Sequence, residues 1–471
     1  MTSRPGTAAI RETSPRPQRA RPQRARTART SKARTSRAGT PPTRTAAPRP
    51  GRRRAAATVL AVATALLASG CGVLPGLDGG SREPVKVMTF APEGTDATNM
   101  PGMPAMAKAY ARWVNANGGV DGHRLTVVTC NEKNTAEGAS QCARQAVEED
   151  VVAVVGSYSQ HGRAFTAPLQ VAGIPFVGGF GASEEEFTNF LSYPVNGGPA
   201  ALFAGQGRQL ADTCRRVAIV RPDSIAGDKL PELLDAGLAQ GGHSEAVDVL
   251  APDNATEYTR QADQARTKAG EGSEASDDKR PGCVTTALGD RTETFVDSFR
   301  RLPDDGRDIA LSSVVGSVGQ SLIDRTGGRS GPFEGAFITG WYPAAADPRW
   351  NQMKNVIDEH AFADNRVDPT DVGTQTTWIA YTVLNATIEA IDADEITAHA
   401  VSQTLADGLE VSTGGVTPTL RWDRGTKLGT PDFPRAVNRH VTFNVVREGR
   451  LVAQEPDFVN VDAILSAQRK N

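Results

Sequence analysis

Two short polar loops carry the residue types that suit ligand binding. The first is 156–160 (GSYSQ) and the second is 178–183 (GGFGAS), and each follows an apolar run that we expect to be a strand. At this edge an open α/β sheet exposes backbone amides and helix N-termini, which together with hydroxyl groups would suit a carboxylate. The alternative role for Ser159 and Ser183 is ordinary capping of the helices that follow.

Signatures of common catalytic sites are absent from the sequence. There is no G-x-S-x-G elbow, no G-x-x-x-x-G-K-[ST] loop and no H-E-x-x-H. The histidines lack metal-ligand spacing, so we expect surface or capping roles for them. They are His123, His161, His243, His360, His399 and His440. The sequence therefore predicts no enzyme, no metal site and no cofactor.

Strands and helices alternate along the body of the chain from Pro84 onward, which is typical of parallel sheets. The expected strands are 85–90, 123–129, 151–155, 174–177, 217–220, 246–250, 284–288, 308–312 and 335–339. The expected helices are 101–117, 135–149, 161–171, 199–213, 227–240, 255–269, 292–301 and 316–324. This pattern predicts an α/β fold with two doubly wound parallel-sheet lobes.

The end of the chain adds helices at 374–391 and 395–407, then strands at 419–422 and 440–454. Helices must return to one lobe and strands to the other, so we expect several crossings and a hinged cleft that holds the ligand. We assign 84–197 and 344–412 to lobe 1, and 198–343 and 413–471 to lobe 2.

Five cysteines are an odd number for an exported protein, and setting Cys71 aside leaves four that can pair. Cys130 ends a strand and Cys142 lies in the next helix, whereas Cys214 and Cys283 stand at the starts of two strands. We predict disulfides Cys130–Cys142 and Cys214–Cys283. Four reduced thiols are the alternative. A zinc site is disfavoured because no pair has the short spacing of zinc ligands.

Charge divides the chain into two parts. Residues 1–54 carry a net charge of +15, and the chain from Cys71 onward carries −17. The Arg- and Pro-rich residues 1–50 are expected to be a disordered tail or a mis-assigned translation start. The acidic body argues against nucleic acid as a partner, because phosphate binding needs clustered positive charge.

Residues 51–70 have the features of an export signal, with a basic run at 52–54 and an apolar stretch at 55–68 that is too short to span a bilayer. Residues 66–71 (LLASGC) resemble the bacterial lipobox, in which the cysteine is lipidated, although Ala68 departs from its commonest form. We therefore expect a lipid anchor on Cys71 at the extracytoplasmic face of the cell membrane. Residues 71–83 are the expected lipidated cysteine and tether.

The order of four motifs in the body resembles the type I periplasmic binding proteins, in the branch of leucine/isoleucine/valine-binding receptors of ABC importers. The motifs are 113–122 (WVNANGGVDG), 151–156 (VVAVVG), 173–177 (GIPFV) and 420–423 (LRWD). The resemblance covers about 85–462. It implies a monomeric receptor that closes over a small polar ligand, such as an amino acid, and presents it to a membrane permease.

The resemblance also implies the ligand contacts. The ligand carboxylate would be bound by Ser159 or Gln160 and by the loop that contains Gly181, Ala182 and Ser183. Glu334, in the second lobe, would bind a ligand ammonium through a charge-assisted hydrogen bond.

Trp341 and Tyr342, near an expected lobe crossing, form either an aromatic wall of the site or a packed hinge. The alternative to transport is a ligand-sensing lipoprotein that acts with a membrane signalling partner.

Overall fold

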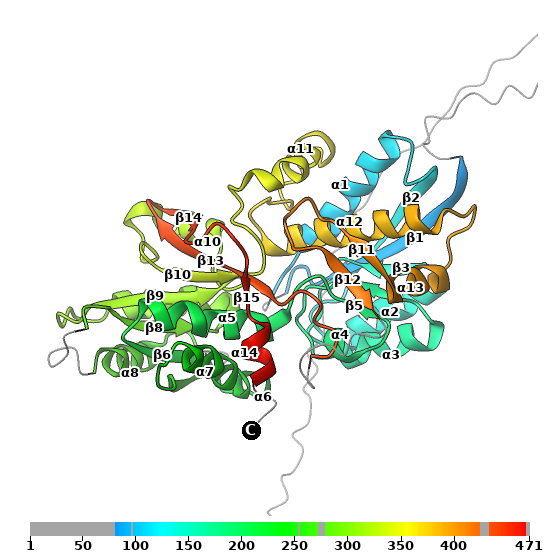
Figure 1. Cartoon of the computed structure of the whole chain (residues 1–471). Coiled ribbons are helices and arrows are strands. Elements are labelled where there is room, and N and C mark those ends of the chain that lie inside the picture. The colour runs from blue at the N-terminus through cyan, green and yellow to red at the C-terminus, as the bar shows by residue number, and fades with distance from the viewer. Residues whose placement is uncertain (1–80, 96–97, 253–254, 272–277, 424–432, 468–471) are drawn as a thin grey trace, which may run out of the picture. The chain divides into compact units, whose positions relative to one another are not determined.

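The computed structural model describes residues 81–95, 98–252, 255–271, 278–423 and 433–467 (Figure 1). They belong to one compact unit, Val73–Asn471. The predicted tail, signal peptide and lipidated Cys71, and the tether up to residue 80, lie outside the described residues. Within the described part of the chain, no helix is both long and apolar enough to cross a membrane.

A five-stranded parallel sheet with the order β2-β1-β3-β4-β5 forms the centre of lobe 1 (Figure 1). Its strands are β1 (Arg82–Ala91), β2 (His123–Asn131), β3 (Ala153–Val155), β4 (Phe176–Val177) and β5 (Ser192–Tyr193). Its helices are α1 (Gly102–Ala116), α2 (Ala136–Glu148), α3 (Gly162–Ala172), α4 (Glu185–Thr188), α11 (Asn351–His360), α12 (Val372–Ile391) and α13 (Ala398–Ala406).

Both faces of this sheet are buried, as is usual for parallel strands. Met88 and Phe90 of β1 pack on the side of α2 and α3, and Val85 and Val87 pack on the side of α1 and α12. Tyr110 of α1 contacts the rings of Trp378 and Tyr381 of α12. These contacts fix α12 in the core of lobe 1.

Lobe 2 contains a larger mixed sheet with the order β14-β13-β10-β9-β8-β6-β7. Its strands are β6 (Arg216–Pro222), β7 (Val247–Ala251), β8 (Gly282–Thr286), β9 (Ile309–Val314), β10 (Phe337–Gly340), β13 (His440–Arg447) and β14 (Arg450–Ala453), and β15 (Val459–Asn460) pairs with β13. β6 to β10 are parallel, whereas β13 runs antiparallel to β10 and to β14.

The helices of lobe 2 are α5 (Gly198–Thr213), α6 (Ile225–Asp228), α7 (Leu230–Gln240), α8 (Thr259–Gly270), α9 (Thr292–Arg300), α10 (Gln320–Arg325) and α14 (Asp462–Ala467). Short 3-10 helices occur at Gly289–Arg291, Gly328–Ser330 and Pro348–Trp350. The predicted α/β fold of two parallel-sheet lobes is thus confirmed.

The described elements change lobe at three places along the chain: between β5 and α5, between β10 and α11, and between β12 (Leu420–Asp423) and β13. Residues of different crossings are joined by hydrogen bonds. Trp341 donates its indole N–H to the Gly198 carbonyl at 3.0 Å, and Asn438 donates its side-chain amide to the Val195 carbonyl at 3.1 Å. The crossings therefore form a connected hinge.

One segment lies on the other side of the expected lobe boundary. We assigned 413–471 to lobe 2, but β12 pairs with β11 (Asp407–Val411) and packs on lobe 1. Trp422 of β12 donates its indole N–H to the Pro194 carbonyl and stacks edge-on against Tyr193 of β5. Burial of this tryptophan explains why the strand remains with lobe 1.

Both expected disulfides are present in the structure. Cys130 of β2 is bonded to Cys142 of α2, with 5.6 Å between the Cα atoms. Cys214 is bonded to Cys283 of β8, with a Cα separation of 5.8 Å. The first joins a strand to the helix that follows it, and the second joins the starts of the neighbouring strands β6 and β8.

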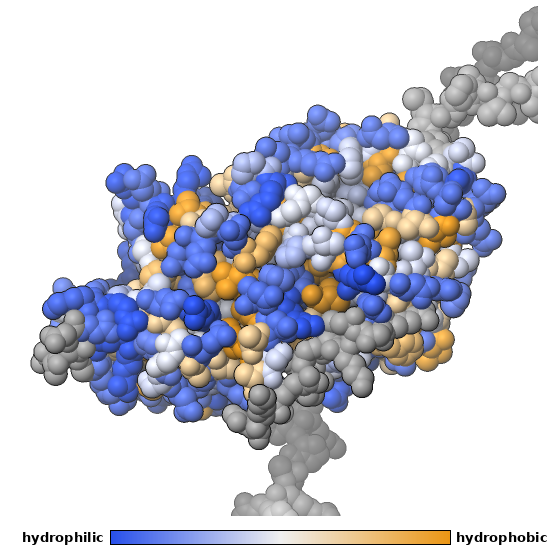
Figure 2. Space-filling model, viewed as in Figure 1, coloured by the Kyte–Doolittle hydropathy of each residue, from blue (hydrophilic) through white to orange (hydrophobic). Residues whose placement is uncertain are grey.

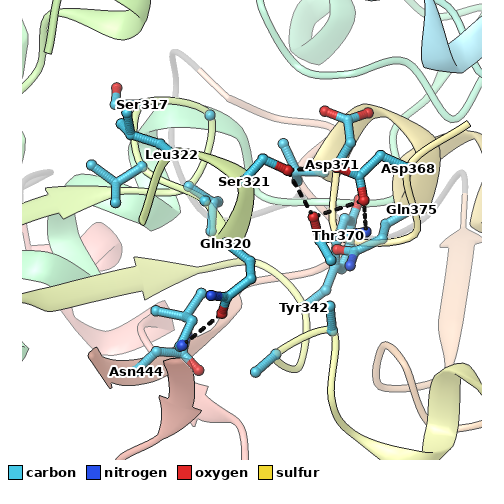
Figure 3. A pocket seen from close by; sticks show the side chains of 18 of the residues that line it. Ser317, Gln320, Ser321, Leu322, Tyr342, Asp368, Thr370, Asp371, Gln375 and Asn444 are labelled. Atoms are coloured by element: carbon cyan, nitrogen blue, oxygen red, sulfur yellow. Dashed lines mark hydrogen bonds between the residues drawn. The ribbon is translucent and has the colours of Figure 1, made fainter. Parts of the chain in front are cut away.

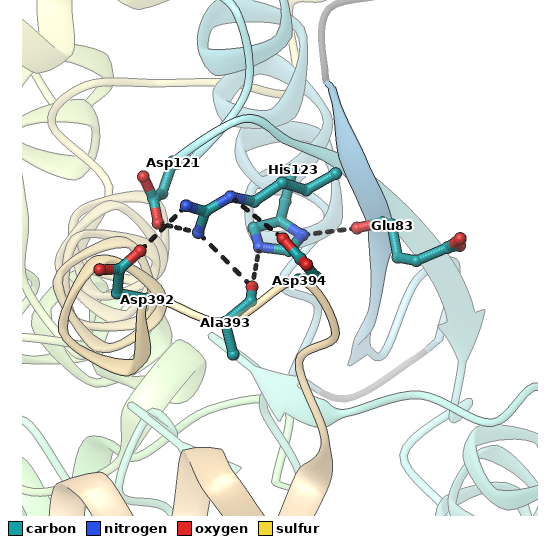
Figure 4. Close-up of polar contacts among 7 residues, drawn as sticks. Glu83, Asp121, His123, Asp392, Ala393 and Asp394 are labelled. Atoms are coloured by element: carbon teal, nitrogen blue, oxygen red, sulfur yellow. Dashed lines mark hydrogen bonds and ion pairs between the residues drawn. The ribbon is translucent and has the colours of Figure 1, made fainter.

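Polar contacts attach the start of β1 to the start of β2 and to the loop after α12 (Figure 4). Arg82 forms ion pairs with Asp121 at 2.6 Å and with Asp392 at 2.9 Å. The buried His123 places Nδ1 2.6 Å from the Glu83 carbonyl oxygen and Nε2 2.9 Å from the Ala393 carbonyl oxygen. The ring thereby links β1, β2 and the loop after α12.

Replacing His123 by leucine is expected to lower the free energy of unfolding by about 2 kcal/mol, because it removes the ring nitrogens that contact two carbonyl oxygens. Urea denaturation measures this change. His399→Leu, an exposed histidine, is the matched control. Equal stability of the two variants would show that the His123 contacts contribute nothing.

Candidate functional site

A cavity of about 660 Å³ lies between the two lobes (Figure 3). Lobe 2 contributes Ser317, Gln320 and Ser321 to its lining, the crossing after β10 contributes Tyr342, and lobe 1 contributes Asp371 and Gln375. Its volume falls within the range that is usual for small-molecule sites. On the face in Figure 2, hydrophilic residues cover most of the surface, and hydrophobic residues gather along the junction of the lobes.

The lobe 2 wall of the cavity is the loop between β9 and α10. We expected a helix from residue 316, but α10 begins only at Gln320. Gly316 has φ +88°, a conformation that L side chains rarely adopt, and it ends the strand in a tight turn. Val315 to Gly319 therefore form a loop at the carboxyl edge of the sheet, and Ser317 lines the cavity.

The lobe 1 wall is the start of α12. Asp371 caps this helix, since its carboxylate accepts the N–H of Thr374 at 2.7 Å. Burial raises the pKa of Asp371 above its usual value. Gln375, one turn later, donates its side-chain amide to the Pro369 carbonyl at 3.0 Å and is 5% exposed. This wall thus offers a carboxyl group and an amide carbonyl to the cavity.

Tyr342 connects the cavity to the hinge. Its hydroxyl accepts a hydrogen bond from the side-chain amide of Asn196 at 3.3 Å and lies 3.2 Å from the Thr376 hydroxyl. Burial raises the pKa of Tyr342 to about 12. The neighbouring Trp341 does not line the cavity and packs edge-on against Phe180. Of the two aromatic residues, Tyr342 therefore belongs to the cavity wall and Trp341 to the hinge.

The cavity carries charged groups of both signs. Arg325 and Glu293 form an ion pair at 2.9 Å. Lys354 and Arg450 also line the cavity and have no ion-pair partner among the described residues. No group of three or more His, Cys, Asp or Glu in the described chain could hold a metal ion.

Ser159 and Gln160 lie outside the cavity lining. The buried Ser159 donates its hydroxyl to the carboxylate of Glu132 at 3.1 Å and accepts the His161 N–H at 3.0 Å. Gln160 is exposed and donates to the Tyr158 hydroxyl at 2.9 Å. Burial raises the pKa of Glu132. In this structure Ser159 therefore bonds to a carboxylate of the chain itself and to the N–H of His161, the residue before α3.

Gly181, Ala182 and Ser183 also lie outside the cavity lining. Their loop surrounds the side chain of Glu186, which is 1% exposed. One carboxylate oxygen accepts the Gly181 N–H at 2.9 Å, and the other accepts the N–H and hydroxyl of Ser183 at 3.0 and 3.2 Å. Burial raises the pKa of Glu186 to about 7. The donors that we assigned to a ligand carboxylate are thus bonded to an internal one.

Glu334, which we expected to bind a ligand ammonium, does not line this cavity. It precedes β10 and lines a different hollow of about 490 Å³. Its two carboxylate oxygens accept the N–H groups of Glu448 and Gly449 at 2.7 and 2.8 Å. These amides form the turn between β13 and β14, so Glu334 stabilises that hairpin.

Of these cavity residues, Tyr342 is one that the sequence indicated, whereas Ser317, Asp371 and Gln375 were not predicted, although part of the signal was present. Ser317 lies in the loop after β9, at the carboxyl edge where ligands bind in open α/β sheets. Asp371 and Gln375 belong to a helix that enters from a distant part of the chain. Only the packing of α12 on α1 brings them to the cleft.

Comparison with known proteins agrees with the fold. Residues 88–432 match a family model described as periplasmic binding protein. A comparison with curated proteins finds no match. Among solved structures, a substrate-binding periplasmic protein from Ralstonia solanacearum has a TM-score of 0.62 and 18% sequence identity, and the match covers 79% of this chain and 100% of that chain.

Two further structures are similar. A leucine-binding protein from Thermotoga maritima has a TM-score of 0.60 and 16% identity, over 80% of this chain and 99% of that one. A solute-binding protein of an ABC transporter from Rhodopseudomonas palustris, in complex with p-hydroxybenzoic acid, has a TM-score of 0.63 and 15% identity, over 80% and 97%. At these identities the structures establish the fold and leave the ligand undefined.

Proposed function

This chain belongs to the periplasmic binding protein family, and from that premise we propose that it is the solute-binding component of an ABC importer. The observation that carries the proposal is the cavity lined by both lobes and by the crossing at Tyr342. A solute in such a cavity contacts both lobes at once, so it favours the closed arrangement and shifts the population toward it. No catalytic role is proposed.

The proposed solute is a small polar molecule, an amino acid or a related compound. The structurally similar proteins include one named for leucine and one bound to p-hydroxybenzoic acid, both small carboxylic acids. In this cavity Lys354 and Arg450 are available to a carboxylate, and Asp371 is available to an ammonium. This assignment replaces Ser159, Gln160, Gly181, Ala182, Ser183 and Glu334 as the proposed ligand contacts.

The proposed location is the extracytoplasmic face of the cell membrane, with the protein held by a lipid on Cys71. This rests on the sequence of the basic run, the apolar stretch and the lipobox-like 66–71. The proposed partner is the membrane permease of the importer. Labelling of cells that express the protein with a radioactive fatty acid tests the anchor. Cys71→Ala is expected to abolish incorporation of the label into the protein.

A solute at 100 times its Kd is expected to stabilise the native chain by about 2.7 kcal/mol. We would measure thermal unfolding of the purified, refolded protein against amino acids, amides, hydroxybenzoates and nucleosides. Gln375→Leu should abolish the shift, because it replaces a polar group of the cavity wall. Glu334→Gln should preserve the shift, because Glu334 serves the β13–β14 turn.

Two results would contradict this assignment. Loss of the shift in Glu334→Gln with normal binding by Gln375→Leu would return the site to the residues expected from the sequence. No shift with any solute would favour the sensing alternative, in which a protein partner closes the lobes.

A further inference from the structure

The two lobes also meet at the cavity, at a contact contributed by side chains alone (Figure 3). Ser321 of α10, in lobe 2, donates its hydroxyl to a carboxylate oxygen of Asp368 at 2.5 Å and lies 3.2 Å from the Thr370 hydroxyl. Asp368 and Thr370 precede α12 of lobe 1, and all three residues line the cavity. We propose that Ser321, Asp368 and Thr370 form a latch that holds the cavity closed and sets how long a solute is retained.

The lobe 1 half of the latch is already oriented. The second carboxylate oxygen of Asp368 accepts the N–H of Thr370 at 2.7 Å and its hydroxyl at 2.8 Å. The carboxylate is therefore fixed, with one oxygen left for the other lobe. The N–H of Asp371 bonds to the Asp368 carbonyl at 3.1 Å, and Asp371 caps α12. The latch thus moves with α12, which is part of the lobe 1 core.

The lobe 2 half is fixed by Gln320, the residue before Ser321. Its side-chain amide donates to the Gly449 carbonyl at 2.9 Å, and its side-chain oxygen accepts the Leu451 N–H at 2.9 Å. These bonds attach α10 to the β13–β14 hairpin and so to the lobe 2 sheet. Opening the cavity at this point therefore requires the hydrogen bond from Ser321 to Asp368 to break, because each residue is fixed to its own lobe.

The size of the effect follows from the type of bond. A hydrogen bond to a charged acceptor is stronger than a neutral one, but Ser321 is exposed, and water replaces its bonds when the lobes separate. The contact is therefore strong enough to bias closure and weak enough to open. We expect loss of the Ser321 hydroxyl to raise the ratio of open to closed molecules about 3- to 10-fold.

A second contact between the lobes is an ion pair, and its effect on closure can be distinguished from that of the latch by adding salt. Lys229 of lobe 2 lies 3.6 Å from Glu184 of lobe 1, and both side chains are more than half exposed. Such pairs are screened at high ionic strength, whereas a hydrogen bond from a neutral hydroxyl is affected less. Measurements in 0.5 M salt, at a Debye length of about 4 Å, therefore remove most of the Lys229–Glu184 contribution and retain that of the latch.

The test measures lobe separation without any solute. Small-angle X-ray scattering of the purified full chain should show a larger radius of gyration for Ser321→Ala and for Asp368→Asn than for the wild type. The double variant should open no further than either single variant, since both remove the same bond. Ser330→Ala and Asp358→Asn are matched exposed controls outside the cavity and should match the wild type.

Scattering of both latch variants equal to that of the wild type, with circular dichroism confirming that they are folded, overturns the latch. The effect of the latch on solute retention rests on the proposed solute-binding function. Its effect on the separation of the lobes does not, because that is measured without a solute. If the variants open but no solute binds, the latch stands and the solute-binding role fails. If a solute binds the wild type and both variants with equal dissociation rates and the lobes stay closed, the latch fails and the solute-binding role stands.

Discussion

Replacing both Cys214 and Cys283 by alanine is expected to lower the free energy of unfolding by about 4 kcal/mol, from the entropy of the loop that the bond closes in the unfolded chain. The two cysteines are separated by 69 positions and link the starts of the neighbouring strands β6 and β8 of the lobe 2 sheet. Both side chains are fully buried, so the variant also loses packing. Urea denaturation of the purified protein measures the change.

The other disulfide provides the matched comparison. Cys130 and Cys142 are separated by only 12 positions, so their loop is shorter and the same argument gives about 3 kcal/mol. The double alanine variant at this pair should therefore be the more stable of the two. If the order is reversed, loop entropy does not govern the contribution of these bonds. If neither pair matters, the cysteines are reduced in the native protein.

Most elements could be predicted from the sequence because burial on both faces gives parallel strands continuous apolar runs. The failures have local causes. β5 has only two residues, Ser192 and Tyr193, and so presents no apolar run. α11 was missed because its polar sequence buries only Met353 and Val356. α10 starts four residues later than expected because two glycines, Gly316 and Gly319, precede it.

The candidate site was harder to predict because the type of a polar residue does not reveal its partner. The loop 178–183 does offer convergent N–H donors, as expected, but Glu186 uses them. The spacing of Ser183 and Glu186 is that of a capping box, which predicts this internal bond. Glu334 precedes its strand, whereas ligands bind beyond the carboxyl ends of strands. That rule favours Ser317, after β9, over Glu334.

The buried carboxyl of Glu186 should make stability depend on pH. Burial raises its pKa from 4.5 to about 7 in the folded protein, so the folded state holds the proton more tightly than the unfolded state. The contribution of this proton to stability is present below pH 4.5 and is lost as the pH rises to about 7. A shift of this size corresponds to about 3 kcal/mol.

Glu186→Gln removes this titration and leaves a neutral side chain of similar shape. Between pH 5 and 8 the wild type is therefore expected to lose stability relative to the glutamine variant, as measured by urea denaturation at each pH. Glu184→Gln, an exposed neighbour, is the control and should follow the wild type. The hydrogen-bond donors of Gly181 and Ser183 act against burial, because they favour the charged carboxylate and so lower the pKa of Glu186. If the difference between wild type and Glu186→Gln stays constant or grows with pH, those donors outweigh burial, and the loop holds a charged carboxylate at every pH tested.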